Sequence, residues 1–123
     1  MASFRYIVSD VDACVGFYCD SLGFSLKQQF GPAMAIVELD DLQLWLAGPA
    51  ASASKPMPDG SMPTPGGWAR VVVPVKDLKA RVTALSATGA RFLNEIVVGP
   101  GGQQILCVDP SGNVVELFQA AGE

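Results

Sequence analysis

The sequence predicts an α+β fold in which two tandem βαβββ modules place their mixed sheets around an open cup. The first observation is a duplication, because residues 3–11 (SFRYIVSDV) and 70–78 (RVVVPVKDL) share an alternating apolar run that closes on Val-x-Asp. The second is that one helical pattern and three strand patterns follow each copy. The duplication pairs positions across the halves, so that Ser3 corresponds to Arg70.

A change of composition separates the two copies. Residues 48–67 are rich in Ala, Ser, Pro and Gly and carry prolines at 56, 58, 63 and 65, so we expect no regular element there. So long a connector is either a mobile surface segment or a functional flap. We therefore expect one domain over residues 1–123, with module one at 1–48, a linker at 49–66 and module two at 67–120.

Module one begins with a strand over residues 3–9, where apolar and polar side chains alternate. Asp10 is a predicted N-cap for a helix over 12–21, which ends at Leu22-Gly23 because glycine adopts the left-handed conformation of a helix terminus. Turns at Gly31-Pro32 and Asp40-Asp41 then divide three further predicted strands, 24–30, 34–39 and 42–47.

Module two repeats this order. A strand is predicted over Trp68–Val75, and Asp77 caps a helix that ends at Gly89. Three strands complete the module at 91–98, 103–108 and 114–118, joined by GPGG at 99–102 and DPSGN at 109–113.

Strand periodicity assigns these side chains to two faces, because residues two apart share a face. One face is wholly apolar and is expected to pack against the helices: Phe4, Tyr6, Val8, Leu42, Leu44, Leu46, Val71, Val73, Val75, Val115 and Leu117. The other face is mixed: Ser3, Arg5, Ile7, Gln43, Trp45, Ala47, Trp68, Arg70, Val72, Val114, Glu116 and Phe118.

The mixed face has the composition of a small-molecule site, with apolar walls and a few orienting polar groups. We predict that the ligand-binding residues are Gln43, Trp45, Trp68, Arg70, Glu116 and Phe118. An alternative interpretation has Arg70 and Glu116 pair as a structural ion bridge, with the tryptophans as a lid or part of the core.

Charge and composition exclude several partners. Eight Lys and Arg against twelve Asp and Glu give a net charge of -4, opposite to the charge that binds phosphate backbones, so nucleic acid is not expected as a partner. No apolar run reaches the roughly 18 residues that span a membrane, and no signal-peptide pattern opens the chain, so we expect no membrane partner and a cytoplasmic protein. Cys14, Cys19 and Cys107 are predicted to be reduced thiols, and without histidine the usual base for a catalytic thiol is missing.

Several motifs resemble the vicinal oxygen chelate superfamily, which includes glyoxalase I, extradiol dioxygenases, fosfomycin-resistance enzymes and bleomycin-resistance proteins. They are, in chain order, VSD at 8–10, VGFY at 15–18, LGF at 22–24, VKDL at 75–78, DPSGN at 109–113 and VEL at 115–117. The resemblance covers nearly the whole chain and implies the glyoxalase/bleomycin-resistance fold and a homodimer.

Metal-dependent members of this superfamily hold a divalent ion with ligands from the first and last strand of each module. Carried onto this chain, those positions are Ser3, Gln43, Arg70 and Glu116, of which only Glu116 is a good ligand. Arg70 places a fixed positive charge where the cation would lie. A catalytic ion normally needs three firm ligands, so we predict no metal site and no cofactor.

The resemblance, with the metal ligands missing, implies a metal-independent protein that binds and sequesters a partly aromatic ligand or drug, as bleomycin-resistance proteins do. One alternative is a metal-free isomerase or lyase with Glu116 as the catalytic base and Arg70 as an electrostatic clamp. A second is a divalent-metal-dependent enzyme like glyoxalase or the dioxygenases. A third is an accessory subunit whose cup binds a protein.

Overall fold

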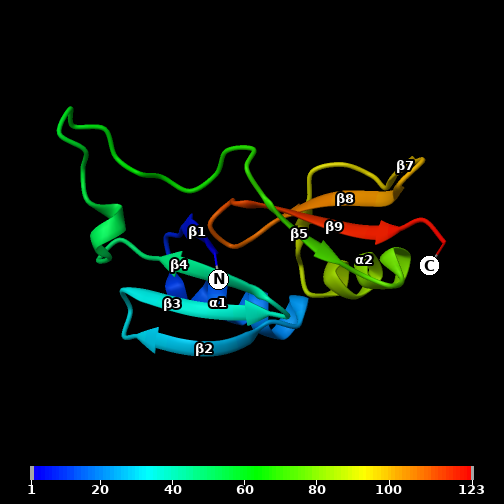
Figure 1. Ribbon diagram of the computed structural model, residues 1–123, viewed down its shortest axis with the longest axis horizontal. Coiled ribbons are helices and arrows are strands. Elements are labelled where there is room, and N and C mark those ends of the chain that lie inside the picture. Colours follow the sequence, from blue (N-terminus) through cyan, green and yellow to red (C-terminus); the bar gives the residue numbers. More distant parts are fainter. Residues whose placement is uncertain (1, 123) are drawn as a thin grey trace. The chain divides into compact units, whose positions relative to one another are not determined.

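The computed structural model describes residues 2–122 and shows an α+β protein with two open mixed sheets and few helices (Figure 1). The fold class expected from the sequence is thereby confirmed at this level. The chain divides into two compact units. Unit 1 contains the residues up to Gly66 together with Pro110–Asn113, and unit 2 contains Gly67–Asp109 together with the residues from Val114 onward.

Unit 1 holds a sheet with strand order β1-β4-β3-β2. Strand β1 runs parallel to β4, whereas β4 with β3 and β3 with β2 are antiparallel. The observed bounds of β3 and β4 are those predicted from periodicity. The four strands are β1 (Ser3–Ile7), β2 (Ser25–Phe30), β3 (Met34–Leu39) and β4 (Leu42–Ala47).

The helical segment of unit 1 differs from the prediction of one helix over 12–21. An α-helix, α1 (Val11–Gly16), is followed directly by a π-helix, η1 (Phe17–Ser21). The widened turn coincides with an aromatic cluster that the helical pattern did not reveal, in which Tyr18 is fully buried between Phe17 and Phe24. The predicted cap is confirmed, because the Asp10 carboxylate accepts a hydrogen bond from Ala13 N at 3.1 Å.

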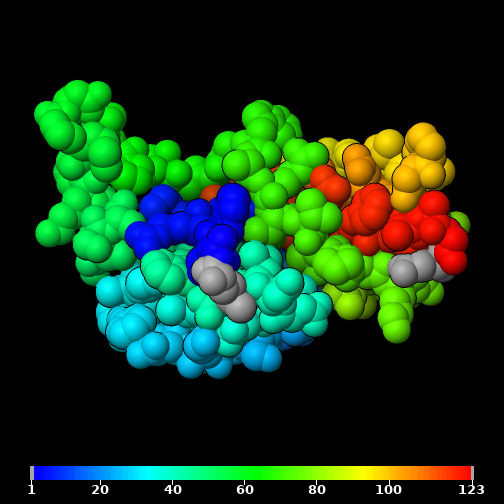
Figure 2. All heavy atoms as spheres, in the orientation of Figure 1, coloured from blue at the N-terminus to red at the C-terminus, as the bar shows by residue number. Residues whose placement is uncertain are grey.

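The connector after β4 contains one short regular element that the sequence prediction missed. A 3-10 helix, η2 (Ser52–Ser54), forms shortly before Pro56, and the Ser54 hydroxyl donates to Gly48 O at 2.7 Å. Beyond it the chain makes a local turn in which Met57 N donates to Ser61 O at 2.8 Å. Figure 2 shows this part of the connector (green, upper left) projecting from the strands of unit 1.

Unit 2 holds a sheet with strand order β5-β9-β8-β6, and β7 also pairs with β8. Strand β5 runs parallel to β9, and the other pairs are antiparallel. The strands are β5 (Val71–Pro74), β6 (Arg91–Phe92), β7 (Val97–Gly99), β8 (Gly102–Val108) and β9 (Val114–Ala120).

The prediction of one strand over 91–98 is wrong, because the segment forms the two short strands β6 and β7. The interruption occurs at Asn94, whose side-chain oxygen accepts a hydrogen bond from Leu106 N of β8 at 2.9 Å. An amide side chain thus takes the ladder position of a backbone carbonyl, and the chain leaves the sheet before it returns as β7.

The prediction of a strand beginning at Trp68 is also wrong. Strand β5 starts at Val71, which pairs with Val115, and β9 itself starts only at Val114. Residues ahead of Arg70 therefore have no partner strand beside them, and they follow Gly66 and Gly67, both at positive φ.

Helix α2 (Leu78–Ala87) begins as predicted, with the Asp77 carboxylate accepting from Ala80 N at 3.1 Å. Gly89 follows its end at φ 85. Helix α1 packs against β3 and β4, and α2 packs against β9, each within its own unit. The apolar faces are buried as predicted, except that Phe4 and Leu42 are only half-buried.

The loop Pro110–Asn113 is held within unit 1 by side chains of the DPSGN motif. Asn113 is 2% exposed; its amide donates to Ile7 O at 2.8 Å and its oxygen accepts from Gly66 N at 2.8 Å. Ser111 Oγ accepts from Ser9 N at 2.8 Å. This motif therefore fixes the ends of β1 and of the connector, a role that its turn-like composition did not indicate.

Candidate functional site

The mixed face of unit 1 carries a chain of polar contacts across its strands. Gln43 on β4 accepts from Ser3 Oγ at 3.3 Å and from Trp45 Nε1 at 3.4 Å through the same oxygen, and its amide nitrogen lies 3.5 Å from Glu38 Oε2. Glu38 in turn forms an ion pair with Lys27 at 3.7 Å. These contacts fix the Gln43 amide and the indole N–H of Trp45 in one orientation.

Arg5 lies beside Trp45 on the same face, since the two residues are direct partners in the β1–β4 register. Its guanidinium carbon is 5.0 Å from the centre of the indole, within the range of a cation–π contact. An open depression of about 350 Å³ lies here, lined by Ser3, Phe4, Arg5 and Trp45. Arg5 was placed on the mixed face by periodicity but was not among the predicted site residues; its cross-strand position opposite Trp45 is the signal that identifies it.

The mixed face of unit 2 brings together two of the predicted site residues. Arg70 Nε donates to Glu116 Oε1 at 3.0 Å, and the Glu116 residue is only 8% exposed whereas Arg70 is half-buried. The geometry is that of a charge-assisted hydrogen bond within an ion pair. This contact agrees with both interpretations of the pair, as groups that orient a ligand and as a structural ion bridge.

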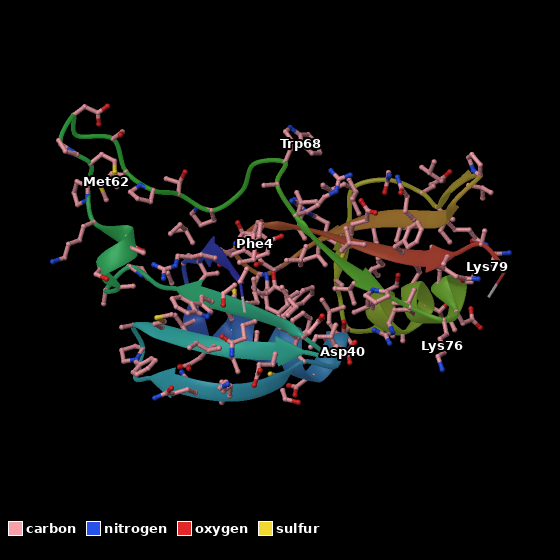
Figure 3. All side chains as sticks on the ribbon, in the orientation of Figure 1. Phe4, Asp40, Met62, Trp68, Lys76 and Lys79 are labelled. Atoms are coloured by element: carbon pink, nitrogen blue, oxygen red, sulfur yellow. The ribbon has the colours of Figure 1, made fainter. Side chains whose placement is uncertain are left out.

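Phe118 lies on the same face of β9, opposite Pro74 on β5 and Gln104 on β8, and it is half-buried. Trp68, by contrast, lies ahead of β5 and is 72% exposed. Figure 3 shows its side chain projecting outward from the chain. Val72 is also exposed, so unit 2 leaves apolar surface uncovered beside the ion pair.

The strand registers correct one correspondence between the repeats. Val8 N donates to Ala47 O in unit 1, and Val75 N donates to Phe118 O at the equivalent place in unit 2. Counting back along β4 and β9 makes Trp45, and not Gln43, the counterpart of Glu116. The position inferred for a metal ligand in the last strand of module one thus holds an indole.

The four corresponding positions do not fit a divalent metal ion. Ser3 and Trp45 offer a hydroxyl and an indole N–H that is a donor only, and Arg70 is a cation. Glu116 already accepts from Arg70. Within residues 2–122, moreover, no three Cys, Asp or Glu side chains are grouped as a metal site requires.

Cys19 and Cys107 have the environments of thiols rather than of reactive thiolates. Within residues 2–122 no cysteine forms a disulfide, and Cys14 and Cys107 are buried. Burial, assisted by the charge of Asp109, raises the pKa of Cys107 to about 11, and burial with Asp20 raises the pKa of Cys19. A raised pKa keeps the thiol protonated at neutral pH, which opposes nucleophilic chemistry.

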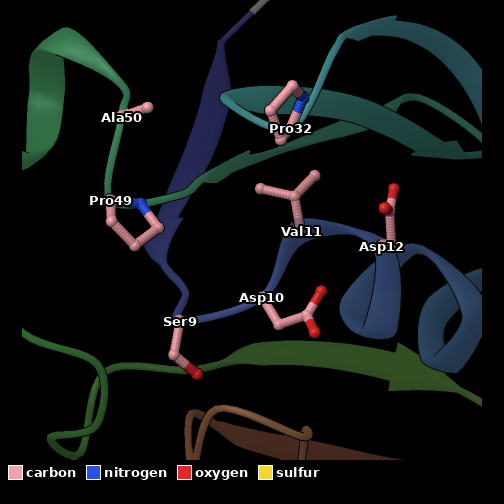
Figure 4. Close-up of a pocket in the computed structure, with 7 residues that line it drawn as sticks. All are labelled: Ser9, Asp10, Val11, Asp12, Pro32, Pro49 and Ala50. Atoms are coloured by element: carbon pink, nitrogen blue, oxygen red, sulfur yellow. The ribbon is translucent and has the colours of Figure 1, made fainter.

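A second depression, of about 240 Å³, lies at the start of α1 (Figure 4). Asp10 and Asp12 line it together with Pro32 and Pro49. Both carboxylates are already used, because Asp10 caps α1 and Asp12 accepts from Gln29 Nε2 at 2.6 Å. Both aspartates therefore have a structural role within unit 1.

Each unit joins a helical segment to an open mixed sheet whose first strand runs parallel to its last, which defines a class of duplicated α+β proteins. Comparison with known proteins identifies the family. The model described as the Glyoxalase/Bleomycin resistance protein/Dioxygenase superfamily matches residues 1–117. The chain belongs to this superfamily. Among curated proteins, none matches the chain. No helix within residues 2–122 is long and apolar enough to cross a membrane.

Solved structures of similar fold include several members of this superfamily. One from Sphaerobacter thermophilus DSM 20745 has a TM-score of 0.75 and 26% identity, over 97% of this chain and 95% of that one. The antibiotic-binding protein TnmS3 from Streptomyces sp. CB03234 has a TM-score of 0.72 and 25% identity, over 97% and 93%. The bleomycin-binding protein from Streptomyces verticillus, complexed with copper(II)-bleomycin, has a TM-score of 0.63 and 22% identity, over 99% and 95%.

Proposed function

We propose that this chain is a metal-independent protein that binds a small, partly aromatic molecule on the mixed faces of its sheets. Trp45, Trp68 and Phe118 supply aromatic contact area, and Gln43, Arg70 and Glu116 orient the ligand. The observation that carries the proposal is that these mixed faces leave aromatic side chains accessible beside polar groups already fixed by hydrogen bonds. Such preorganised polar groups among apolar walls are typical of ligand sites.

Two observations support binding in preference to turnover. Glu116 accepts a hydrogen bond from Arg70 at 3.0 Å, so the carboxylate that would serve as a general base is engaged by a guanidinium. The donor set at the four inherited metal positions also lacks the ligands that Lewis-acid chemistry needs. The similarity to TnmS3, an antibiotic-binding protein, supports a drug-like ligand.

Intrinsic fluorescence provides the test, because Trp45 and Trp68 are the two tryptophans of the chain. Trp68→Phe leaves Trp45 as the reporter, and Trp45→Phe leaves Trp68. Aromatic antibiotics, with bleomycin included, are titrated into the wild type and into each single-tryptophan variant. We expect quenching that saturates, and a loss of affinity of about tenfold or more on Trp68→Ala or Arg70→Ala.

The matched control is Phe30→Ala, which removes another exposed aromatic side chain, from β2, and should leave affinity unchanged. Unchanged affinity in both Trp68→Ala and Arg70→Ala would show that these faces are not the site. Consumption of the ligand that Glu116→Gln abolishes, while binding survives, would establish the enzyme instead. A stoichiometric divalent ion in elemental analysis would overturn metal independence.

A further inference from the structure

The geometry points to Arg5 as the anchor for a carboxylate, so that the depression beside Trp45 takes a small aromatic carboxylate. This inference rests on the proposed function, and it names the chemical class of the ligand and a residue that selects it. The residues of this depression all belong to unit 1, where they lie on β1 and β4.

Among residues 2–122, Arg5 has no anionic partner. The ion pairs formed within residues 2–122 are Lys27 with Glu38 and Arg70 with Glu116, and neither includes Arg5. The chain has twelve carboxylate side chains against eight Lys and Arg, so acidic partners are abundant. An exposed arginine left unpaired in an acidic chain retains its donors for another molecule.

The guanidinium is nevertheless held in place. It lies 5.0 Å from the centre of the Trp45 ring, which is itself fixed through the hydrogen bond from its Nε1 to Gln43. A cation–π contact engages the face of the indole ring and leaves guanidinium N–H groups able to donate. Because the side chain is already ordered, less conformational entropy is lost when a ligand binds.

The neighbouring polar groups already form hydrogen bonds with one another, so they are less available than Arg5 to bind a ligand. Ser3 donates to Gln43, and Gln43 contacts Ser3, Trp45 and Glu38. Arg5 is therefore the group in this depression with the most unused hydrogen-bonding capacity. Its planar fork matches the two oxygens of a carboxylate.

The side chains that line the depression and its volume indicate the chemistry and the size of the rest of the ligand. Trp45 supplies aromatic surface beside Arg5, and Phe4 also lines the depression. The volume of about 350 Å³ is near the lower end of small-molecule sites, which suits one or two rings rather than a large drug. A ring that carries a carboxylate satisfies both the apolar walls and the cation.

Three acid–amide pairs test the inference: benzoate, phenylacetate and 3-phenylpropionate, each against its primary amide. Calorimetry on the full chain measures affinity, and quenching in the Trp68→Phe protein reports contact at Trp45. We expect each acid to bind about tenfold or more tightly than its amide, since a charge-assisted pair is lost in the amide. Arg5→Gln should remove this preference.

Arg91→Gln is the matched control, because it makes the same change at an exposed arginine of β6 and should retain the preference. Arg5→Lys keeps the charge but loses the planar fork, so it should retain only part of the preference. Thermal melting of each variant checks that the fold is intact.

The outcomes separate the inference from the proposed function. Acids and amides that bind equally and both quench Trp45 would overturn the carboxylate anchor and leave the binding function standing. A preference that survives Arg5→Gln would also overturn it. Failure of all six probes to bind overturns the inference, and the antibiotic titrations then decide the proposed function separately.

Discussion

Arg5 and Arg70 lie on the mixed faces of the two repeats, but only Arg70 has a carboxylate partner. Arg70 is half-buried and bonded to Glu116, whereas Arg5 is exposed and stacked on Trp45. The registers make Trp45 and Glu116 counterparts. Arg70 corresponds to Ser3, and Arg5 corresponds to Val72. Equivalent positions of the last strand therefore contact an arginine from different positions of the first strand, as a closed ion pair in unit 2 and as an open cationic surface in unit 1.

The helix-facing sides of the two sheets have diverged much less. Leu46 and Leu117 are counterparts and both are fully buried, and both repeats begin their helix with an aspartate cap. Packing requirements constrain such positions, because a buried side chain must fill a fixed volume. The comparison indicates that the duplicated scaffold was retained for its core while its mixed faces took on separate chemistry.

The largest expected effect tests the similarity of the two cores. Leu46→Ala and Leu117→Ala should each lower the free energy of unfolding by about 2–5 kcal/mol, because each deletes a fully buried side chain and leaves a cavity. Urea unfolding followed by circular dichroism measures both. A loss below about 1 kcal/mol in one variant would show that its core is not packed like that of the other repeat.

The elements that periodicity predicted well are those fixed by local chemistry and by alternating burial. Strands β3 and β4 have the predicted bounds, and Asp10 and Asp77 cap their helices as expected. An aspartate before an apolar helical run has few alternative roles, and alternation along a strand directly reflects which side is buried.

The errors arose where a distant part of the chain decides the outcome. Trp68 lies outside a strand because its neighbour β9 begins only at Val114, and 91–98 is interrupted because Asn94 bonds to Leu106 on β8. Neither fact is visible in the local pattern. Each depends on which residue of another strand lies opposite.

The sequence predicted which face of the sheet each candidate site residue lies on, but not which residue of the neighbouring strand it contacts. Alternation placed Arg5, Gln43 and Trp45 on one side of the sheet, whereas the pairing of Arg5 with Trp45 needs the β1–β4 register. The same limitation led to Gln43 being matched with Glu116 when the register matches Trp45. Motif spacing therefore identified the family more securely than it identified corresponding residues.

The next effect tests the difference between the two arginines. Arg70→Met should lower the free energy of unfolding by about 1–3 kcal/mol, because it leaves the Glu116 carboxylate buried without its partner. Arg5→Met should change it by less than about 0.5 kcal/mol, since Arg5 is exposed and satisfies no buried group. Urea unfolding of both variants makes the comparison directly.

The double variant Arg70→Met with Glu116→Leu refines this test. An apolar pair of similar size removes the unpaired charge, so stability should return to within about 1 kcal/mol of the wild type. Equal losses in Arg70→Met and Arg5→Met would contradict the view that only one of the two arginines belongs to the scaffold.

The smallest effect at neutral pH concerns Cys107, whose counterpart in the first repeat is Val37. Burial and then the charge of Asp109 raise the pKa of Cys107 from 9.0 to about 11. The folded protein keeps the thiol protonated, whereas the unfolded chain ionises it above its ordinary pKa. The stability that this provides is complete below about pH 9 and is lost as the pH rises through about 11.

Cys107→Val copies the residue of the other repeat and removes this titration. Near pH 7 the variant should differ from the wild type by less than about 1.5 kcal/mol, because the two side chains have similar volumes. Between about pH 9 and 11 the wild type should lose about 1.4 kcal/mol per pH unit relative to the variant. Urea unfolding at several pH values measures this difference. Lysines and tyrosines also titrate in this range, but their effect is the same in both proteins and cancels in the comparison.

Cys19→Ala is the control for the alkaline experiment, because Cys19 is only half-buried and lies in the π-helix rather than in a sheet. Because the Cys19 thiol is less desolvated than that of Cys107, Cys19→Ala should retain most of the wild-type fall in the free energy of unfolding at alkaline pH. If Cys107→Val retains the wild-type slope, the thiol is accessible in the folded protein, and the second sheet is more open at this position than its valine-bearing counterpart. If the slope disappears, the two sheets enclose corresponding positions equally well, and the repeats differ in chemistry rather than in packing.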